Sequence, residues 1–323
     1  MGLNIDQSIA DLTKNEYLSL DQVEENLIQL DYLFRNTLNE QGRKDNRGIF
    51  VVAYLATTNS IVSELKKQQE SGQGKFVDPQ WVEAYLITFA NLYRAALHAH
   101  TQNREMPQTW GFAFDKARND RGIISLQHLM LSINAHVVHD LPVAVYQVGI
   151  GRTDAEREKR RQDHIIINET IRDTVNPIQD AVTHYHRSQG FSLLDKVLGP
   201  FDEWITRRFF EDQRTRAWQN AVYLTRLANN EPFEDAQTAW TIRTKASITN
   251  FDDLKRQIDQ IGLEFANAMV VWGKLPLPRI PGFESLTPFD PIEPILDDEE
   301  LNLLKEELAR SEAQTAADWT EII

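Results

Sequence analysis

Residues 127–142 read QHLMLSINAHVVHDLP, an apolar helical stretch that also carries three histidines, an asparagine and an aspartate. Buried polar groups cost free energy unless they find hydrogen-bond partners or a chemical role. We therefore expect this stretch to form a core helix of the fold. Its polar side chains are the first candidates for a functional site.

Helical geometry places most of these polar side chains on one side of the stretch. At about 100° per residue, an arc of about 120° contains five of them: His128, Ser132, His136, His139 and Asp140. His136 and Asp140 are four residues apart, a spacing at which a carboxylate orients an imidazole or both side chains bind one ion. Asn134 points away from the arc, so we expect it to bond a neighbouring helix or loop. The alternative is a purely structural polar network that clamps helices together.

A second polar helix is predicted after a short connection. All eight histidines lie between His98 and His186, and His164 and Asn168 again have a four-residue spacing, with Asp163 adjacent. If this helix packs antiparallel on 127–142, its polar groups meet those of the first helix. Two histidines with one or two carboxylates suit Zn²⁺, Fe²⁺ or Mn²⁺. The alternative is that Asp163 and His164 face solvent.

The rest of the chain predicts an all-α protein, because apolar residues recur at helical spacing and strand signals are scarce. Asp78 before Pro79 is typical of a helix start, and Asn250 caps a helix that begins at Phe251. Pro177 should interrupt its helix. The other predicted helices cover about 20–41, 46–70, 107–118, 122–148, 154–187, 200–229 and 232–246. Together they predict a multi-helix bundle over residues 1–273.

The C-terminal segment, 274–323, differs in composition. Residues 274–296 hold six of the twelve prolines, which predicts an extended tether, and Leu301, Leu304 and Leu308 then mark a short amphipathic helix. Eleven acidic and two basic residues follow residue 289, so this tail carries nine of the fourteen net negative charges. Three roles are open for this tail: it covers the body, it pairs with a second copy in a homo-oligomer, or it remains mobile.

Composition excludes several classes of function. The chain has no cysteine, so any metal site must use His, Asp, Glu or Asn. The acidic balance and the interleaving of basic with acidic residues argue against nucleic acid as a partner. No apolar run reaches the roughly 18 residues of a membrane span, and the start lacks the pattern of a secretory signal. A cytoplasmic protein that acts on a small molecule is the expectation.

The central stretch also resembles a known family. Residues 126–141 are similar to the signature helix of a bacterial family of unknown function, roughly H-x-L-x-G-x-N-A-H-x-x-x-D-L, with Met130 and Ser132 in place of its usual Leu and Gly. His139 is not part of that pattern. Further blocks are similar to the family over residues 89–93, 110–114 and 214–221. The resemblance implies an emphasis on His128, Asn134, His136 and Asp140 but no particular reaction. Separately, His139-Asp140 resembles the pair of HD-type metal phosphohydrolases.

The leading hypothesis is a small-molecule enzyme with a buried, metal-assisted site for a largely apolar substrate. Zn, Fe or Mn would be held by residues from both polar helices: His128, His136, Asp140, Asp163 and His164. In this scheme His164 or Asp163 also serves as a general base, and Asn134 positions the substrate. The predicted substrate pocket consists of Trp110, Asn168, Arg214 and Trp218.

Two further hypotheses remain open at this point. One is a metal-free cyclase, lyase or isomerase in which Asp140 orients His136 and the imidazole moves a proton. The other is a noncatalytic ligand-binding protein or scaffold whose polar cluster only sets the register of the helices.

Overall fold

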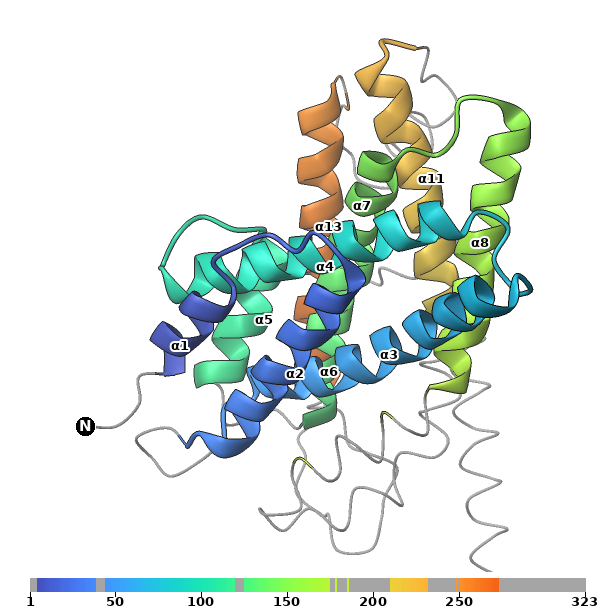
Figure 1. Cartoon of the computed structure of the whole chain (residues 1–323). Coiled ribbons are helices and arrows are strands. Elements are labelled where there is room, and N and C mark those ends of the chain that lie inside the picture. Colours follow the sequence, from blue (N-terminus) through green and yellow to red (C-terminus); the bar gives the residue numbers. More distant parts are fainter. Residues whose placement is uncertain are drawn as a thin grey trace, which may run out of the picture. The chain divides into compact units, whose positions relative to one another are not determined.

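The computed structural model describes residues 5–38, 44–119, 125–174, 178, 185, 210–231, 248 and 250–272. These residues form helices joined by turns, with no strand among them (Figure 1), so the predicted all-α class is confirmed. The chain divides into two compact units, Met1–Met269 and Val270–Ile323. Several predicted features lie outside the described residues: the interruption at Pro177, the helix over 232–246, and the tether and acidic helix within 274–323.

The N-terminal part of the first unit contains four helices: α1 (Ile5–Leu12), α2 (Leu20–Asn36), α3 (Arg47–Ser71) and α4 (Pro79–Thr101). Only the short α1 was not predicted. The Ser19 side chain accepts a hydrogen bond from the backbone N–H of Gln22 and thereby caps α2. The side chain of Asp78 caps α4 in the same way, and proline occupies the first position of that helix, as predicted.

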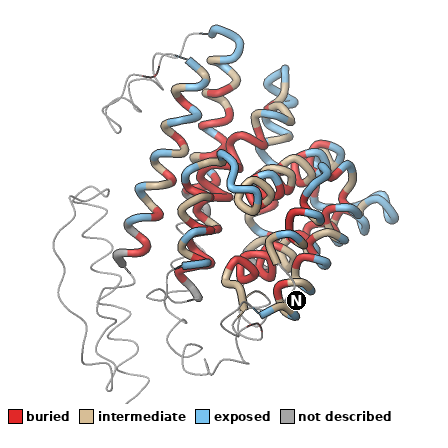
Figure 2. Tube along the Cα trace, turned by 90° about the vertical axis from the view of Figure 1, so that its left-hand side faces the viewer, coloured by how far each residue is buried: buried red, intermediate tan, exposed pale blue. Residues whose placement is uncertain are grey.

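One long helix lies at the centre of the remaining part. This helix consists of α6 (Ser125–Asn134), the π-helical turn η1 (Ala135–Asp140) and α7 (Leu141–Val148). It packs against α3, α4, the preceding helix α5 (Gln108–Asn119) and the later helix α11 (Phe210–Ala228). The last two helices are α8 (Asp154–Asp173) and α13 (Phe251–Trp272). Buried positions gather where these helices meet (Figure 2).

The central helix departs from the regular α-helix that the sequence predicted. At the end of η1 the backbone N–H of Leu141 donates to the carbonyl of His136, five residues back. Proline at position 142 has no N–H, and its ring would crowd the carbonyl of Val138 in a regular α-helix. A wider turn relieves this crowding, and all six residues of η1 are buried. Such turns occur often at functional sites.

The packing of α8 differs from the prediction. The sequence suggested that α8 lies antiparallel along the central helix, but its main neighbours are α3, α4 and α11. The connection from α7 turns sharply, because Gly149 and Gly151 have φ angles of 83° and 103°, which L-residues rarely adopt. Arg160 then donates to the carbonyl of Gly149 and to Asp78, and so fixes α8 beside the start of α4.

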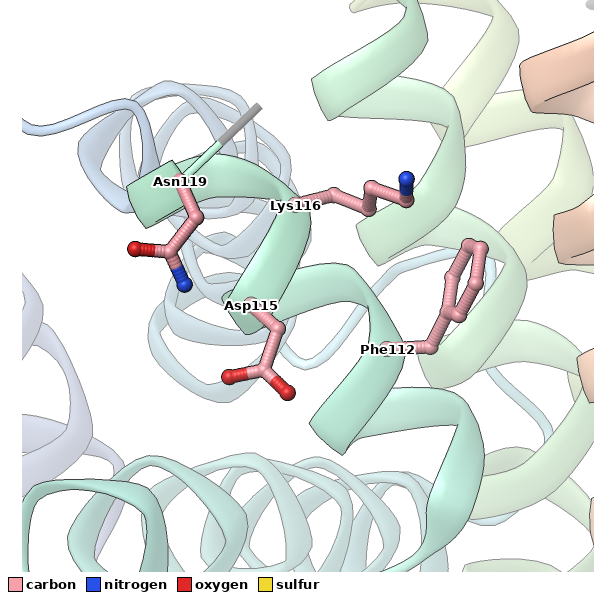
Figure 3. A pocket seen from close by; sticks show the side chains of 4 residues that line it. All are labelled: Phe112, Asp115, Lys116 and Asn119. Carbon is pink, nitrogen blue, oxygen red and sulfur yellow. The ribbon is translucent and has the colours of Figure 1, made fainter. Parts of the chain in front are cut away.

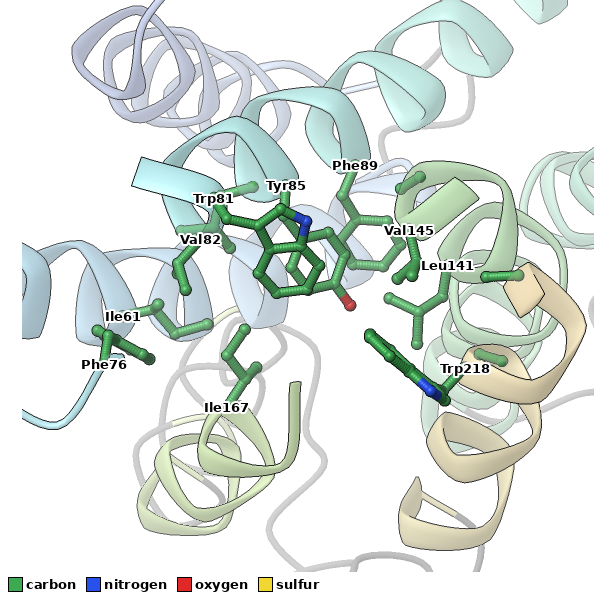
Figure 4. Close-up of a cluster of buried hydrophobic side chains, with 14 of the residues drawn as sticks. Ile61, Phe76, Trp81, Val82, Tyr85, Phe89, Leu141, Val145, Ile167 and Trp218 are labelled. Atoms are coloured by element: carbon green, nitrogen blue, oxygen red, sulfur yellow. The ribbon is translucent and has the colours of Figure 1, made fainter. Parts of the chain in front are cut away.

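A large hydrophobic cluster lies where α3, α4, α7, α8 and α11 meet (Figure 4). Its aromatic members include Trp81, Tyr85 and Phe89 from α4 and Trp218 from α11. The long helix α3 also contributes to it. By length and composition α3 would be able to cross a membrane, but 61% of its most apolar window is buried inside the molecule, so this is weak evidence for a membrane span.

Helix α13 approaches α5 and η1 closely at Gly262. A Cβ atom at this position would overlap the side chain of Thr109 and would contact Val138. One turn earlier, the Asp259 carboxylate accepts hydrogen bonds from the backbone N–H groups of Gln108 and Thr109 and from the Thr109 hydroxyl. Helix α13 therefore supplies the N-terminal cap of α5, which has proline rather than a capping side chain before it.

We expect Gly262→Ala to lower the free energy of unfolding by about 1–3 kcal/mol, because the added methyl group overpacks the contact with Thr109. Urea denaturation measures the change. The matched control is Gly111→Ala on α5, where an added Cβ meets nothing closer than Met106 at 3.9 Å. This control should be neutral or stabilising, since alanine favours a helix over glycine by up to about 1 kcal/mol. Equal effects of the two substitutions would contradict the close crossing at Gly262.

Candidate functional site

The centre of the site is the carboxylate of Asp140, which is 1% exposed and accepts three hydrogen bonds. Its Oδ2 lies 2.8 Å from Trp110 Nε1 and 2.9 Å from His136 Nδ1. Its Oδ1 lies 2.8 Å from His139 Nδ1. We call these four residues the Asp140 group. Helix α5 supplies the tryptophan, and the π-helical turn η1 supplies the other three residues.

Electrostatics define the protonation state of the Asp140 group. Burial opposes ionisation of Asp140, but the hydrogen bonds from His136 and His139 outweigh it and hold the pKa of the carboxyl below its usual value. Burial also lowers the pKa of His136, although the hydrogen bond to Asp140 opposes this shift. At neutral pH the site therefore holds a carboxylate beside a neutral imidazole. Because a carboxylate only accepts hydrogen bonds, Nδ1 of each histidine carries the proton.

This arrangement leaves one basic ring nitrogen of His136, Nε2, without a hydrogen bond in the described part of the chain. With the proton on Nδ1, Nε2 carries a lone pair, and this atom is buried without a hydrogen-bond partner among the described residues. The His136 ring lies inside an aromatic box in which the Phe89 ring stacks at 3.5 Å between centroids. The box consists of Phe50, Tyr54, Phe89, Tyr93 and Trp110.

A buried nitrogen without a partner is unusual in proteins and costs free energy. Here the carboxylate holds the imidazole in one orientation and stabilises the imidazolium that forms when Nε2 accepts a proton. The aromatic walls exclude water and favour an apolar molecule beside that nitrogen. The Asp140 group is thus able to accept and return a proton in an apolar environment.

The predicted residues of α8 form a second group. The two oxygens of Asp163 each lie 2.7 Å from a backbone nitrogen, that of Val77 or that of Asp78, and so fix the loop before α4. His164 uses both ring nitrogens: Nε2 donates to the carbonyl of Arg214 at 2.9 Å, and Nδ1 accepts from the Tyr85 hydroxyl at 3.3 Å. Burial, and then the charge of Arg214, bring the pKa of His164 well below its usual value.

Arg214 lies on α11 against these residues. Its Nε donates to the side-chain oxygen of Asn168, and its Nη2 donates to the backbone carbonyl of His164 at 3.1 Å. The Trp218 ring completes the set, 5.5 Å from the His164 ring. We call these four residues, together with Tyr85, the Arg214 group. Three of the four predicted pocket residues are thus neighbours, while Trp110 belongs to the Asp140 group.

The other predicted residues of the central helix have separate partners. His128 Nε2 accepts a hydrogen bond from the side chain of Asn46 at 3.2 Å. Asn134 donates to the carbonyl of Gly262 at 2.8 Å, which confirms the expected bond to a neighbouring helix. The oxygen of the Asn134 side chain is buried without a partner among the described residues. Both side chains thus have partners outside the Asp140 group.

The ligand set predicted for a metal is divided among these places. His136 and Asp140 bond each other, Asp163 and His164 bond α4 and α11, and His128 bonds Asn46. Within the described part of the chain, no three His, Asp or Glu side chains are placed to hold one metal ion. The predicted set does not fit a single ion as these residues stand, so we derive no step through a metal.

A hollow on the surface of α5 is a separate feature (Figure 3). It is lined by Phe112, Asp115, Lys116 and Asn119. At about 100° per residue, these four side chains lie on the side of α5 opposite Trp110. The hollow therefore opens away from the Asp140 group.

Sequence reasoning missed three features of the site. His139 was given less weight, yet it bonds Asp140 directly. Trp110 was expected to line a pocket, whereas it is fully buried and donates to the carboxylate. The aromatic box was not predicted at all, although Phe89 and Tyr93 lie four residues apart in a block that the family resemblance included. Proline at position 142 was the available signal for the π-helical turn.

We expect Trp110→Phe to lower the free energy of unfolding by about 1–3 kcal/mol, because Asp140 loses one of its three donors in a buried setting. Chemical denaturation measures this loss. Trp218→Phe is the matched control, since the Trp218 indole shows ring contacts with Trp81 and His164 and no hydrogen bond within the described part of the chain. A loss as large in the control would show that ring size, rather than the hydrogen bond, sets the cost.

Folding stability should fall as the pH drops below about 6.5. Burial lowers the pKa of three histidines from the usual 6.5: His100, His136 and His164. Below about pH 6.5 these residues therefore bind more protons in the unfolded chain than in the folded chain. Each contributes a slope of up to about 1.4 kcal/mol per pH unit below that value. His164→Gln should make the dependence shallower, whereas Tyr85→Phe, which keeps the imidazole, should not. Urea denaturation between about pH 5 and 7.5 tests this, and identical slopes in wild type and His164→Gln would contradict it.

Comparison with known proteins gives a family for the chain. No curated protein and no solved structure matches it. A family model described as "Family of unknown function (DUF5995)" matches residues 21–255, from the start of α2 to the first turn of α13. This segment includes every member of the Asp140 and Arg214 groups and more than half of the sequence. The chain therefore belongs to the family of unknown function DUF5995.

Proposed function

We propose that the protein is a metal-free acid–base enzyme that acts on a small, largely apolar molecule. The observation that carries this proposal is the state of His136, whose Nδ1 is fixed by Asp140 while its Nε2 is buried without a partner among the described residues. His164, in contrast, has a partner for each ring nitrogen. Only the first histidine has a lone pair available for a substrate.

In this proposal His136 Nε2 removes a proton from the substrate and returns it at another atom. The Asp140 carboxylate stabilises the imidazolium in between, and the Trp110 and His139 donors keep that carboxylate ionised and in place. Such general acid–base catalysis typically contributes about 10²–10⁴-fold to a rate. Lyases, cyclases and isomerases are the reaction classes that need only this step.

The aromatic box favours an apolar substrate and suggests how it enters. Phe89 and Tyr54 are each 9% exposed, more than the other members of the box, and His136 is 4% exposed. We therefore place the entrance beside these two rings. Small movements of their side chains would admit a substrate to Nε2, as apo sites often tighten only in the complex.

The test is deuterium incorporation. A base that removes a carbon-bound proton exchanges it with solvent, so wild-type protein incubated with a small-molecule extract in D₂O should add one mass unit to its substrate. His136→Gln should reduce this incorporation about 10²–10⁴-fold. Asp140→Asn should do the same, because an amide donor turns His136 to the tautomer with its proton on Nε2. Mass spectrometry of the extract provides the readout.

His100→Gln serves as the control for this experiment. His100 is also a histidine with a lowered pKa, but it bonds Arg47 and Asp115, outside the Asp140 group. Its substitution should leave the incorporation unchanged. Incorporation that persists in His136→Gln, or that is absent from wild type across extracts of several chemical classes, would sink the acid–base proposal and favour the scaffold hypothesis.

Elemental analysis separates this proposal from the metal-assisted hypothesis. We expect protein purified without a histidine tag or chelator to hold far less than one equivalent of Zn, Fe or Mn, because the candidate ligands bond other partners. Near-stoichiometric metal that both His136→Ala and Asp140→Ala remove would contradict the acid–base proposal. It would establish the metal site predicted from the sequence instead.

A further inference from the structure

Arg214 is a buried cation whose partners are all neutral. Its residue is 3% exposed, and its hydrogen bonds go to the amide oxygen of Asn168 and to the backbone carbonyl of His164. The Tyr85 hydroxyl lies beside it: burial raises the pKa of that phenol, and the Arg214 charge opposes the shift. Within the described part of the chain, no carboxylate forms an ion pair with this guanidinium.

Such an arrangement is costly unless something compensates for the charge. A buried charge without a counterion carries a large desolvation penalty, and buried arginines are normally paired with carboxylates. Arg47 of the same protein follows that rule, since it is 2% exposed and binds both Asp45 and Asp6. The contrast shows that the described residues supply Arg214 with no counterion, and a bound anion would provide one.

We propose that Arg214 binds the carboxylate of a small molecule with an apolar body. This inference deepens the proposed function and rests on it where it names that molecule as the substrate. Guanidinium has five N–H donors. The Asn168 side chain, the His164 carbonyl and the Tyr85 hydroxyl engage at most three of them, so at least two remain for an anion. Tyr85 and Trp218, whose side chains lie near each other in Figure 4, would provide a polar and an apolar wall beside Arg214.

The local charge favours a carboxylate over a phosphate. The Arg214 group contains one cation, because burial and the Arg214 charge keep His164 neutral. A carboxylate carries one negative charge and matches the planar guanidinium with two parallel hydrogen bonds. A phosphate near neutral pH carries more charge than this single cation compensates for. The described residues around the group are mostly aromatic and aliphatic, so they would not compensate for the second negative charge of a phosphate.

Helix α4 connects this anion site with the Asp140 group. Tyr85 and Phe89 lie one turn apart on α4, with 6.1 Å between ring centroids. The first ring stacks on His164, and the second stacks on His136. The charge of Arg214 also contributes to the lowered pKa of His136, so the two groups lie within electrostatic reach of each other. One small molecule with a carboxylate at one end is therefore suited to both.

The test compares phenylacetate with its neutral isostere phenylacetamide. Phenylacetate should raise the melting temperature of the full-length protein in a saturable manner, because a ligand that binds only the folded state stabilises it. Phenylacetamide should have a much smaller effect. In Arg214→Met the dissociation constant for phenylacetate should rise at least about tenfold. Arg214→Lys keeps the positive charge but loses the planar pair of N–H donors. Its dissociation constant for phenylacetate should lie between those of wild type and Arg214→Met.

Arg226→Met is the matched control, since Arg226 is an exposed arginine on the same helix. It should bind phenylacetate as wild type does. Equal responses to phenylacetate and phenylacetamide, or a response that survives in Arg214→Met, would overturn the inference. A larger response to inorganic phosphate than to phenylacetate would overturn the choice of a carboxylate. If Arg214→Met fails to fold, Arg214→Lys alone tests the anion site. Phenylacetate binding that is unchanged in Arg214→Lys would then contradict the inference.

The binding experiment and the deuterium experiment fail independently. His136→Gln should keep its affinity for phenylacetate, because the carboxylate bonds Arg214 and not the imidazole. Binding that depends on Arg214 without deuterium incorporation would support the anion site and reject the acid–base enzyme. Deuterium incorporation that depends on His136, without phenylacetate binding, would support the acid–base enzyme and reject the anion site.

Discussion

The buried carboxylate of Asp140 is the interaction on which the rest of the site depends. A carboxylate that is 1% exposed is tolerated only if its lone pairs are engaged, and here three donors engage them. The π-helical turn makes this possible because it brings His136, His139 and Asp140 to the same buried place. The same bonds orient the imidazole of His136 and leave its second nitrogen available.

The donor that completes this set depends on contacts far away in the sequence. Trp110 follows Thr109, whose backbone is capped by Asp259 from α13. Gly262, one turn further along α13, accepts the hydrogen bond of Asn134 and lets the helices approach. A chain of contacts therefore runs from α13 through the start of α5 to Asp140. Helix α13 is in this sense part of the support of the site, although it contributes no residue to it.

The two buried histidine environments show how neighbours decide the chemistry of one residue type. His164 gives its proton to a carbonyl and accepts one from a phenol, so it is saturated and holds α4, α8 and α11 together. His136 has a carboxylate on one side and aromatic rings on the other. Both imidazoles are held neutral by burial. Among the described residues, His136 has one ring nitrogen without a partner, whereas both nitrogens of His164 are bonded. Arg214, which lies next to His164, has no carboxylate partner in this part of the chain.

Local periodicity, capping chemistry and a four-residue spacing were enough to predict the helical class, the caps at Asp78 and Asn250, and the pairing of His136 with Asp140. Which polar groups share a site became clear from the packing of the helices. The glycine connection at 149–151 directs α8 to α4 and α11, and proline at position 142 accompanies a wider turn in the central helix. Angles drawn on a regular helix carry no information about either event, because they assume the α-helical turn that η1 replaces and they stop where the glycine connection begins.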